Sequence, residues 1–168
     1  MTTNIHKTID SPIGALTLTA ADGVLSGVYF PGHWHMPPPE VFGTRAEAGF
    51  EAAEAQLGEY FAGERTEFQL ETVAHGDAFQ RSVWELIDRI PYGRTATYGE
   101  LAAELGDPTM ARRVGGAVGR NPLSVIVPCH RVVGGDGKLT GYAGGLERKR
   151  FLLDLEHAEL LAGAPRLF

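Results

Sequence analysis

The sequence predicts a two-part α/β protein: a strand-rich module with one helix, then a helical region with the outline of a helix-turn-helix. Three apolar stretches between residues 5 and 30 predict strands, and Asp22-Gly23 between two of them is typical of a hairpin turn. After residue 77, apolar residues recur at helical spacing. A chain of 168 residues, of which 43% are hydrophobic and 21% charged, is long and apolar enough to bury a core.

Composition excludes several classes of protein. Disorder as the main state requires low hydrophobicity, which this chain does not have. The longest apolar runs are far too short to cross a bilayer, and the first residues contain no apolar segment typical of a secretory signal. A single cysteine cannot form an internal disulfide. We therefore expect a soluble, cytoplasmic protein with no membrane partner.

The first 76 residues predict a small β-rich module that includes a helix. A Pro-rich loop over 31–43 separates the first strands from that helix, and the sequence assigns it no role. The predicted elements are strands over 5–9, 14–20 and 23–30, a helix over 45–62 and a short strand over 68–73.

Capping signals predict where the next helices begin. An amphipathic helix over 77–90 has Asp77 as a candidate N-cap and ends at Pro91-Tyr92-Gly93. Thr97 and Glu100 have the spacing of a capping box, which begins a second, short helix.

The outline of a helix-turn-helix follows. The short helix ends at Gly106, and Asp107-Pro108 starts a further helix over 108–119, because an N-cap followed by proline is a common helix start. Arg112 and Arg113 lie early in this last helix, where such a motif approaches DNA.

Charge is distributed unevenly along the chain. Residues 1–80 carry a net charge of −8, whereas residues 81–168 carry +2. The stretch 112–150 holds 8 basic and 2 acidic residues, and phosphate binding depends on such local positive density. From charge alone, a solvated basic face is the favoured interpretation.

Cys129 is the one thiol, and a lone cysteine is either a small buried hydrophobe or a nucleophile. Pro128 before it stiffens the chain, while His130 and Arg131 after it supply the proton-accepting and positive neighbours that favour a thiolate. Adjacent strand side chains point to opposite faces, so Cys129 and His130 meet only if the chain turns or a water bridges them. Glu156 is a candidate to orient the histidine, or a surface acid.

Three further features each allow two interpretations. His33-x-His35 is a weak ligand pair, since structural zinc sites use about four ligands, and we expect no metal and no cofactor. Gly115-Gly116 inside a helix indicates close approach of another backbone, including that of a nucleic acid, or tight helix packing. Tyr98 is a core aromatic or places its hydroxyl near a site.

The motif around Cys129 resembles a known signature. Ile126-Val127-Pro128-Cys129-His130-Arg131-Val132-Val133 is similar to the active-site string of the O6-alkylguanine-DNA alkyltransferases, or methylated-DNA–protein-cysteine methyltransferases. The resemblance covers residues 77–157 closely and 1–76 loosely, and it is nearest to short single-function bacterial members. The further similar stretches, in the same order, are SPIGALTL near the N-terminus, residues 90–102, 111–122 and 137–145, and the last helix with Glu156.

This resemblance implies a fold and an activity. The implied fold is an N-terminal ribonuclease-H-like α/β module over 1–76 and a C-terminal winged helix-turn-helix DNA-binding domain over 77–168 that carries the cysteine. The implied activity is DNA repair by direct reversal: binding the minor groove of double-stranded DNA, flipping out an O6-alkylguanine, and moving its alkyl group irreversibly to the cysteine. Each molecule acts once, as a monomer in solution. O4-alkylthymine as a second substrate and cooperative binding along DNA are left open.

Matched residue by residue, the resemblance also implies roles. Cys129 is the alkyl acceptor, His130 is a general base acting through a bridging water, and Glu156 orients His130. Tyr98 presses on the target phosphate and protonates the leaving guanine, and Asn121 joins the recognition helix to the active-site segment. The DNA-binding set, in which Arg112 fills the gap left by the flipped base, is Arg112, Tyr98, Arg113, Gly115 and Arg120. The residues expected to line the substrate pocket are Val132, Tyr142, Ala143, Gly144 and Gly145.

Two other functions are open at this point. A non-catalytic sensor of alkylation damage shares the fold, but such proteins resemble this family with the cysteine replaced. A cysteine hydrolase needs turnover, an oxyanion hole and a direct contact between Cys129 and His130. The zinc ligands of some family members are missing here, so no metal is carried over. Residues 158–168 are expected to form a surface tail.

Overall fold

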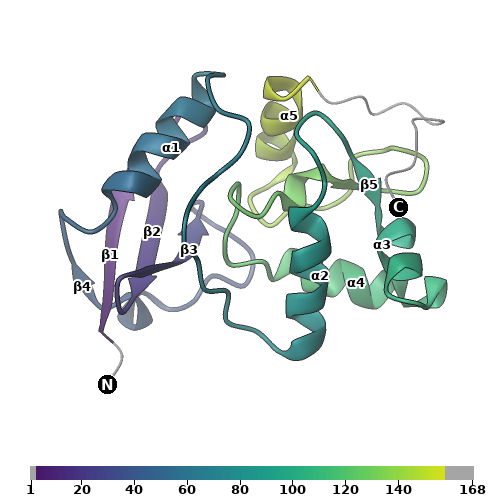
Figure 1. Ribbon diagram of the computed structural model, residues 1–168, viewed down its shortest axis with the longest axis horizontal. Coiled ribbons are helices and arrows are strands. Elements are labelled where there is room, and N and C mark those ends of the chain that lie inside the picture. Colours follow the sequence, from purple (N-terminus) through teal and green to yellow (C-terminus); the bar gives the residue numbers. More distant parts are fainter. Residues whose placement is uncertain (1–2, 158–168) are drawn as a thin grey trace.

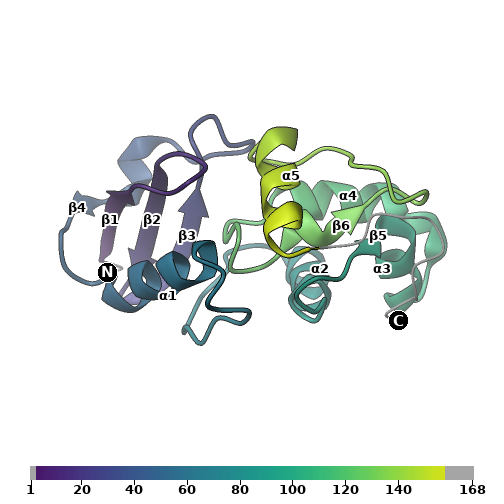
Figure 2. The same ribbon diagram turned by 90° about the horizontal axis from the view of Figure 1, so that it is seen from above.

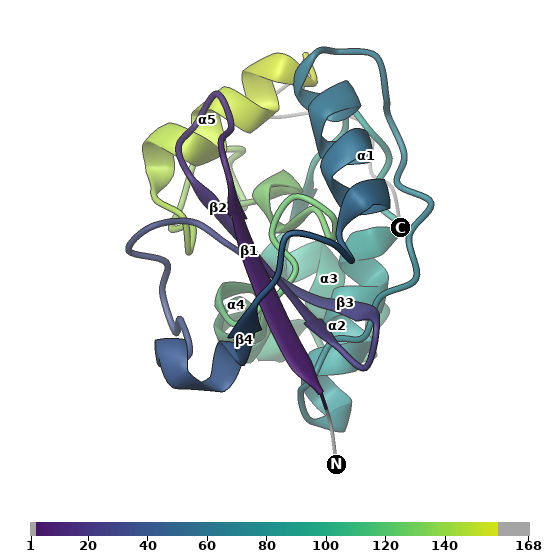
Figure 3. The same cartoon turned by 90° about the vertical axis from the view of Figure 1, so that its left-hand side faces the viewer.

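The N-terminal half is a four-stranded sheet covered by one helix. In the computed structural model, which describes residues 3–157, the strand order is β3-β2-β1-β4, with β1–β2 and β2–β3 antiparallel and β1–β4 parallel. Helix α1 lies along one face of the sheet, and the loop after β3 with the 3₁₀ turn η1 lies on the other (Figure 3). The elements are β1 (Asn4–Ile9), β2 (Leu16–Ala21), β3 (Val24–Tyr29), η1 (Pro39–Phe42), β4 (Thr44–Arg45) and α1 (Glu51–Phe61).

Strand β2 shows how the alternating sequence builds this half. Leu16 and Leu18 point to the same face, are fully buried, and belong to one hydrophobic cluster with Tyr60 of α1. The turn that joins β2 to β3 has positive φ at both Asp22 (49°) and Gly23 (83°), as a tight two-residue hairpin turn requires. The predicted hairpin is therefore confirmed.

Two predictions for this half are wrong. The helix expected from residue 45 begins only at Glu51, because the preceding residues form β4 and a glycine-containing turn. The strand expected over 68–73 is reduced to a single bridge between Thr72 and Leu25. This segment meets β3 at one position and then crosses to the second half, so its alternating pattern reflects partial burial rather than a strand.

Within the described residues the C-terminal half contains four α-helices, and side chains cap the starts of the first two (Figure 1). Asp77 accepts a hydrogen bond from the Gln80 backbone N–H (2.8 Å), and the Gln80 side chain accepts one from the Asp77 N–H (3.0 Å). Thr97 and Glu100 form the same reciprocal pair, so both predicted caps are confirmed. The elements are α2 (Ala78–Asp88), β5 (Ala96–Thr97), α3 (Tyr98–Glu104), η2 (Pro108–Met110), α4 (Ala111–Gly119), η3 (Cys129–Arg131), β6 (Val132–Val133) and α5 (Leu146–Leu155).

Helices α3 and α4 form the predicted helix-turn-helix. The helix expected over 108–119 is divided, since the 3₁₀ turn η2 precedes α4. Asp107 caps η2 by accepting from the Thr109 N–H (2.9 Å). Behind this pair, β5 and β6 form a short parallel ladder that connects the start of α3 to the segment after Cys129.

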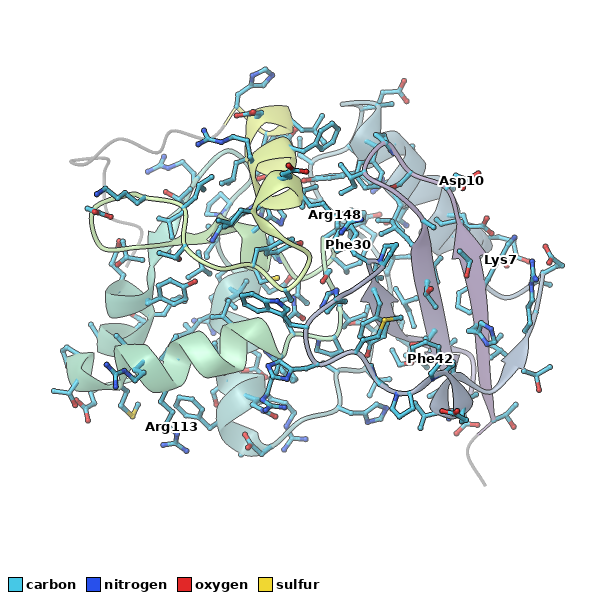
Figure 4. All side chains as sticks on the ribbon, turned by 180° about the vertical axis from the view of Figure 1, so that it is seen from behind. Lys7, Asp10, Phe30, Phe42, Arg113 and Arg148 are labelled. Carbon is cyan, nitrogen blue, oxygen red and sulfur yellow. The ribbon has the colours of Figure 1, made fainter. Side chains whose placement is uncertain are left out.

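The two halves are packed together rather than only tethered. The Val28 N–H on the edge of β3 donates to the Pro122 carbonyl (2.8 Å), which continues the sheet toward the second half. Helix α5 stands at the junction between the halves (Figure 2). Its Arg148 lies over the Phe30 ring at 5.1 Å and donates to the Ile13 carbonyl at 2.8 Å, and Figure 4 shows Arg148 and Phe30 side by side. The predicted surface tail, 158–168, lies outside the described residues.

The α2 cap gives a test of local stability. Asp77→Ala removes the side-chain acceptor of the capping box, so we expect the free energy of unfolding to fall by about 1 kcal/mol in urea denaturation. Glu85→Ala, at an exposed position in the middle of the same helix, serves as the control. An equal effect of the two substitutions contradicts the capping role.

Candidate active site

A tight 3₁₀ turn, η3, presents the single thiol. The Cys129 N–H donates to the Val127 carbonyl (2.8 Å), and Pro128 before it has φ −80° and ψ 64°. Because the chain turns at this point, Cys129 and His130 are not held on opposite faces of a strand. The Cys129 side chain is almost completely buried, at 2% exposure, so a reaction partner must enter a closed site to reach the sulfur.

Asn121 connects helix α4 to this turn. Its Nδ2 donates to the Val127 carbonyl (2.9 Å), and its Oδ1 accepts from the Leu123 N–H (3.0 Å). The side chain is buried, and its proximity to the Cys129 thiol acts to lower the pKa of that thiol. A displacement of α4 is therefore transmitted directly to the backbone that holds the sulfur.

Glu156, which follows α5, is the centre of a buried hydrogen-bond cluster. Its Oε2 lies 2.7 Å from Nε2 of His130 and accepts from the Tyr60 hydroxyl. Arg131 donates from Nε to Oε1 (2.8 Å) and from Nη2 to Oε2 (3.0 Å). Tyr60 belongs to α1, so the N-terminal half contributes a donor to this cluster.

These contacts determine which groups are charged. Burial alone would raise the pKa of Glu156, but its hydrogen bonds with His130 and Arg131 outweigh burial and hold that pKa well below its usual value. Burial also lowers the pKa of His130, against the opposing effect of Glu156, so its ring is neutral at neutral pH. The ionised Glu156 accepts the proton on Nε2, and Nδ1 is left as a proton acceptor, buried and without a hydrogen-bond partner among residues 3–157.

Lys149 of α5 provides a positive charge near the sulfur. It is fully buried, and its Nζ donates to the Val132 carbonyl (2.6 Å) and lies 3.3 Å from the Thr140 carbonyl. Burial lowers the pKa of Lys149 to about 8. For Cys129, burial raises the pKa, while Asn121 and Lys149 act in the opposite direction. The thiol is thus protonated at rest, within an environment that favours its ionisation.

The loop before α5 covers the sulfur. Tyr142 is 3% exposed, and burial and the neighbouring Cys129 raise the pKa of its hydroxyl. Gly144 allows close approach of the Phe30 ring, since a Cβ there would lie 2.4 Å from Cδ2 of that ring. At the other end of the loop, the Thr140 hydroxyl donates to the Tyr98 hydroxyl (3.0 Å), and burial raises the pKa of Tyr98.

Comparison with known proteins matches both halves to one family. Residues 4–74 match the 6-O-methylguanine DNA methyltransferase ribonuclease-like domain, and residues 78–158 match the DNA binding domain of the same family. The chain belongs to the 6-O-methylguanine DNA methyltransferase family. The methylated-DNA–protein-cysteine methyltransferase of Mycolicibacterium paratuberculosis is 50% identical over 151 residues, covering 90% of this chain and 91% of that protein.

Solved structures agree with this membership. The crystal structure of Mycobacterium tuberculosis O6-methylguanine methyltransferase has a TM-score of 0.84 and 48% identity, covering 92% of this chain and 93% of that one. The crystal structure of M. tuberculosis OGT in complex with DNA has a TM-score of 0.86 and 46% identity, covering 95% and 96%. The mixed α/β fold, with a ribonuclease-like half and a DNA-binding half, is as the sequence predicts.

Within this family member, the predicted site residues fall into two groups. Cys129, His130, Asn121 and Glu156 are buried together, with the fully buried Val132 directly after η3. The pocket loop holds Tyr142, Ala143 and Gly144, which are buried, and Gly145, which is exposed.

The predicted DNA-binding residues lie on and around α4. Arg112 and Arg120 are exposed, near its start and just after its end. The Arg113 guanidinium lies over the Phe79 ring at 3.9 Å, so it is held against α2 (Figure 4). A Cβ at Gly115 would meet the Tyr98 ring at an ordinary 3.7 Å, whereas one at Gly116 would meet nothing within 4 Å. Packing among residues 3–157 therefore does not account for Gly116.

Several basic residues of the stretch 112–150 face inward rather than toward phosphate. Arg131 and Lys149 are both buried and bonded inside the protein. Arg148 is likewise bonded to backbone carbonyls, at Ile13 among others. The position of Arg131 directly after Cys129 and His130 was the one signal for its inward role, whereas nothing in the sequence connects Tyr60 to Glu156, 96 residues later.

The weak metal-ligand pair does not form a cluster. His33 is buried, its Nδ1 accepts from the Phe30 N–H (3.3 Å), and burial lowers its pKa to about 4. Among the described residues there is no group of three or more His, Cys, Asp or Glu side chains suited to a metal ion. Within the same range, no helix is long and apolar enough to cross a membrane.

The Glu156 cluster predicts a pH-dependent stability. Glu156→Gln leaves Arg131 buried without its carboxylate, so we expect the free energy of unfolding at pH 7 to fall by about 3 kcal/mol or more. The lowered pKa of Glu156 means that its contribution is complete above its usual pKa of about 4.5 and is lost as the pH falls toward the folded-state pKa. The difference in free energy of unfolding between wild type and variant should therefore narrow by about 1.4 kcal/mol for each pH unit below that value.

Urea unfolding at pH 7 and pH 3.5 measures this gap. Glu147→Gln, at an exposed position of the same helix, is the matched control and should show no such gap at either pH. A gap of equal size at both pH values would show that Glu156 is not ionised in the folded protein.

Proposed function

We propose that this protein repairs DNA by transferring the alkyl group of an O6-alkylguanine in double-stranded DNA to the sulfur of Cys129, once per molecule. The observation that carries the proposal is the buried thiol beside a neutral histidine whose other nitrogen is held by an ionised carboxylate, Glu156, in a chain of this family. O4-alkylthymine, which offers a similarly placed alkyl group, is the second candidate substrate.

His130 is the base in this proposal. Its Nε2 is held by Glu156, so Nδ1 is the atom available to take a proton, and it has no hydrogen-bond partner in the described chain. A bridging water between the thiol and Nδ1 carries the proton in one relay. Glu156 then stabilises the imidazolium that forms, because the two groups are only 2.7 Å apart.

The transfer step balances without a cofactor. A sulfur electron pair of Cys129 forms the new S–C bond to the alkyl carbon, and the C–O6 bond breaks with its electrons moving to the guanine. The thiol proton passes to His130, and the leaving guanine takes the hydroxyl proton of Tyr98. Proton exchange with solvent then restores Tyr98 and His130. The product is a thioether, which no group in the site can displace, so each molecule reacts once.

The neighbours of Tyr98 position its hydroxyl to donate a proton to the leaving guanine. Burial raises the pKa of its hydroxyl, and the hydroxyl accepts from Thr140, which leaves its own proton free to be donated. Tyr98 is also the first residue of α3 in the helix-turn-helix, so it is a candidate to meet the phosphate of the flipped nucleotide.

The α4 surface supports DNA as the partner. Arg112 and Arg120 are exposed there, and the side of α4 at Gly116 is open, which suits close approach of a nucleic-acid backbone. In this proposal Arg112 enters the minor groove and fills the place of the flipped base. Arg113, held over Phe79, contributes positive charge at the edge of the same surface.

The acting species is proposed to be a monomer. Tyr60, Asn121, Cys129, His130 and Glu156 all come from one chain and complete the reactive site without a second copy. Cooperative binding along DNA is compatible with this, since it requires only contacts between monomers outside the site.

The competing function is a damage sensor that binds but does not react. The presence of Cys129, with a base and a carboxylate behind it, favours the reactive protein. A cysteine hydrolase is disfavoured, because it requires a direct Cys129–His130 contact and repeated turnover.

Intact-mass and peptide-mass analysis after incubation with a duplex containing one O6-methylguanine tests the proposal. We expect one methyl group on the Cys129 peptide, saturating at one per protein and absent in Cys129→Ser. The same duplex with an unmodified guanine is the control. Tight binding without an adduct would identify a damage sensor, and no preference for the lesion would overturn the proposal.

Lys149 gives a second, electrostatic test. Lys149→Met removes the positive charge that lowers the pKa of Cys129, so we expect the pH–rate profile for alkylation of the thiol by iodoacetamide to move to higher pH. Each unit of displacement costs about a tenfold loss of rate at neutral pH. Arg150→Met, the exposed neighbour on α5, is the control, and a profile that coincides with wild type contradicts the role of Lys149.

A further inference from the structure

The Pro-rich loop after β3, to which the sequence assigned no role, lies against the pocket loop. The Trp34 N–H donates to the Ala143 carbonyl (2.9 Å), and Nη1 of Arg148 lies 3.4 Å from the Pro31 carbonyl and 3.0 Å from the Gly144 carbonyl. His33, directly before Trp34, is buried and bonded to the Phe30 N–H. The backbone at Trp34 is therefore fixed from both sides.

The indole of Trp34 spans two elements of the C-terminal half. A Cβ added to Gly141 would lie 2.7 Å from Cη2 and 3.1 Å from Cζ3 of Trp34, and one added to Gly119 would lie 3.9 Å from its Cε3. Gly119 is the last residue of α4, and Gly141 directly precedes Tyr142 of the pocket loop. The six-membered ring of the indole thus lies between the recognition helix and the pocket loop, where neither glycine provides a side chain.

This position borders a closed site, because the Trp34 N–H bonds Ala143, the residue directly after Tyr142. Cys129 and Tyr142 are 2% and 3% exposed, so a flipped guanine must pass between the elements that cover them. Trp34 is 51% exposed, which is a large apolar surface to leave in water. Val41 is equally exposed, at 51%, but belongs to η1 and lines a separate groove with Phe42 and Pro122.

We propose that Trp34 forms the outer wall of the alkylguanine pocket and limits the size of the O6 substituent that the protein accepts. The inference rests on the proposed alkyl transfer to Cys129. A rigid indole, held by a backbone hydrogen bond and seated on Gly141, narrows the mouth of the pocket from the N-terminal half. A methyl group fits within this limit, whereas a benzyl group must displace the ring.

Trp34→Ala tests the wall with two substrates. We expect the second-order rate constant for free O6-benzylguanine to rise about tenfold, while that for O6-methylguanine in a duplex changes less than about twofold. Trp34→Phe, which keeps an aromatic ring, should stay close to the wild-type ratio of the two rates. Val41→Ala is the matched control for loss of an exposed apolar side chain, and it should leave both rates unchanged.

Gly141→Ala provides an independent test that spares Trp34. The three atoms nearest to the added Cβ all belong to Trp34, and Gly141 does not have a positive φ, so the substitution acts chiefly by displacing the indole. We expect it to change the benzyl-to-methyl rate ratio in the wild-type background and to have no further effect in Trp34→Ala. Equal effects in both backgrounds would show that Trp34 does not mediate the change.

The outcomes separate this inference from the proposed function. If wild type acquires no alkyl group on Cys129, the proposed function itself fails. If wild type reacts but Trp34→Ala leaves the rate ratio unchanged or lowers the benzyl rate, the size limit is wrong. A loss confined to the duplex substrate would identify Trp34 as a DNA contact and would also overturn the size limit. Thermal melting of each variant confirms that the comparison is made between folded proteins.

Discussion

The buried carboxylate of Glu156 is the interaction on which the rest of the structure depends. An ionised group removed from water is stable only when paired and hydrogen-bonded, and here three side chains supply the donors. Tyr60 belongs to α1, whereas His130 and Arg131 belong to η3, the turn that carries the thiol. The hydrogen bonds to this one carboxylate therefore join the two halves of the chain. The same contacts hold His130 in the tautomer that leaves Nδ1 free to accept a proton. The hydrogen bonds that stabilise the buried carboxylate therefore also prepare the base.

Opposing effects also act on the pKa of the Cys129 thiol. Burial raises the pKa of Cys129, which keeps the sulfur protonated and unreactive toward chance electrophiles, a useful property for a residue that can react only once. Asn121 and Lys149 oppose the effect of burial on the pKa of Cys129, so ionisation becomes favourable only when a proton acceptor and a fitted substrate are both in place. The site is therefore poised by opposing effects rather than by a permanently ionised nucleophile.

Features that depend on neighbouring residues were predictable from the sequence, and features that depend on distant residues were not. The caps at Asp77 and Thr97 and the hairpin at Asp22-Gly23 were correct because their partners lie within three residues. The strand expected over 68–73 failed because alternation also arises in a segment that is half buried without a partner strand. The inward direction of Lys149 could not be predicted, since a basic residue on a helix is normally exposed. Its burial is made favourable by the distant carbonyls of Val132, Thr140 and Gly141, which accept from Nζ.

The N-terminal half emerges as part of the reactive site rather than as a separate support. Tyr60 donates to the carboxylate behind the base, Phe30 fills the space beside Gly144, and the loop at Trp34 bonds the backbone of the pocket loop. The cysteine, histidine and recognition helix all belong to the C-terminal half, but that half alone would expose an underbonded carboxylate and an unsupported pocket loop. Substitutions in the N-terminal half can therefore change the shape of the pocket without altering the motif that contains Cys129, because Phe30 and the loop at Trp34 contact the pocket loop from outside that motif.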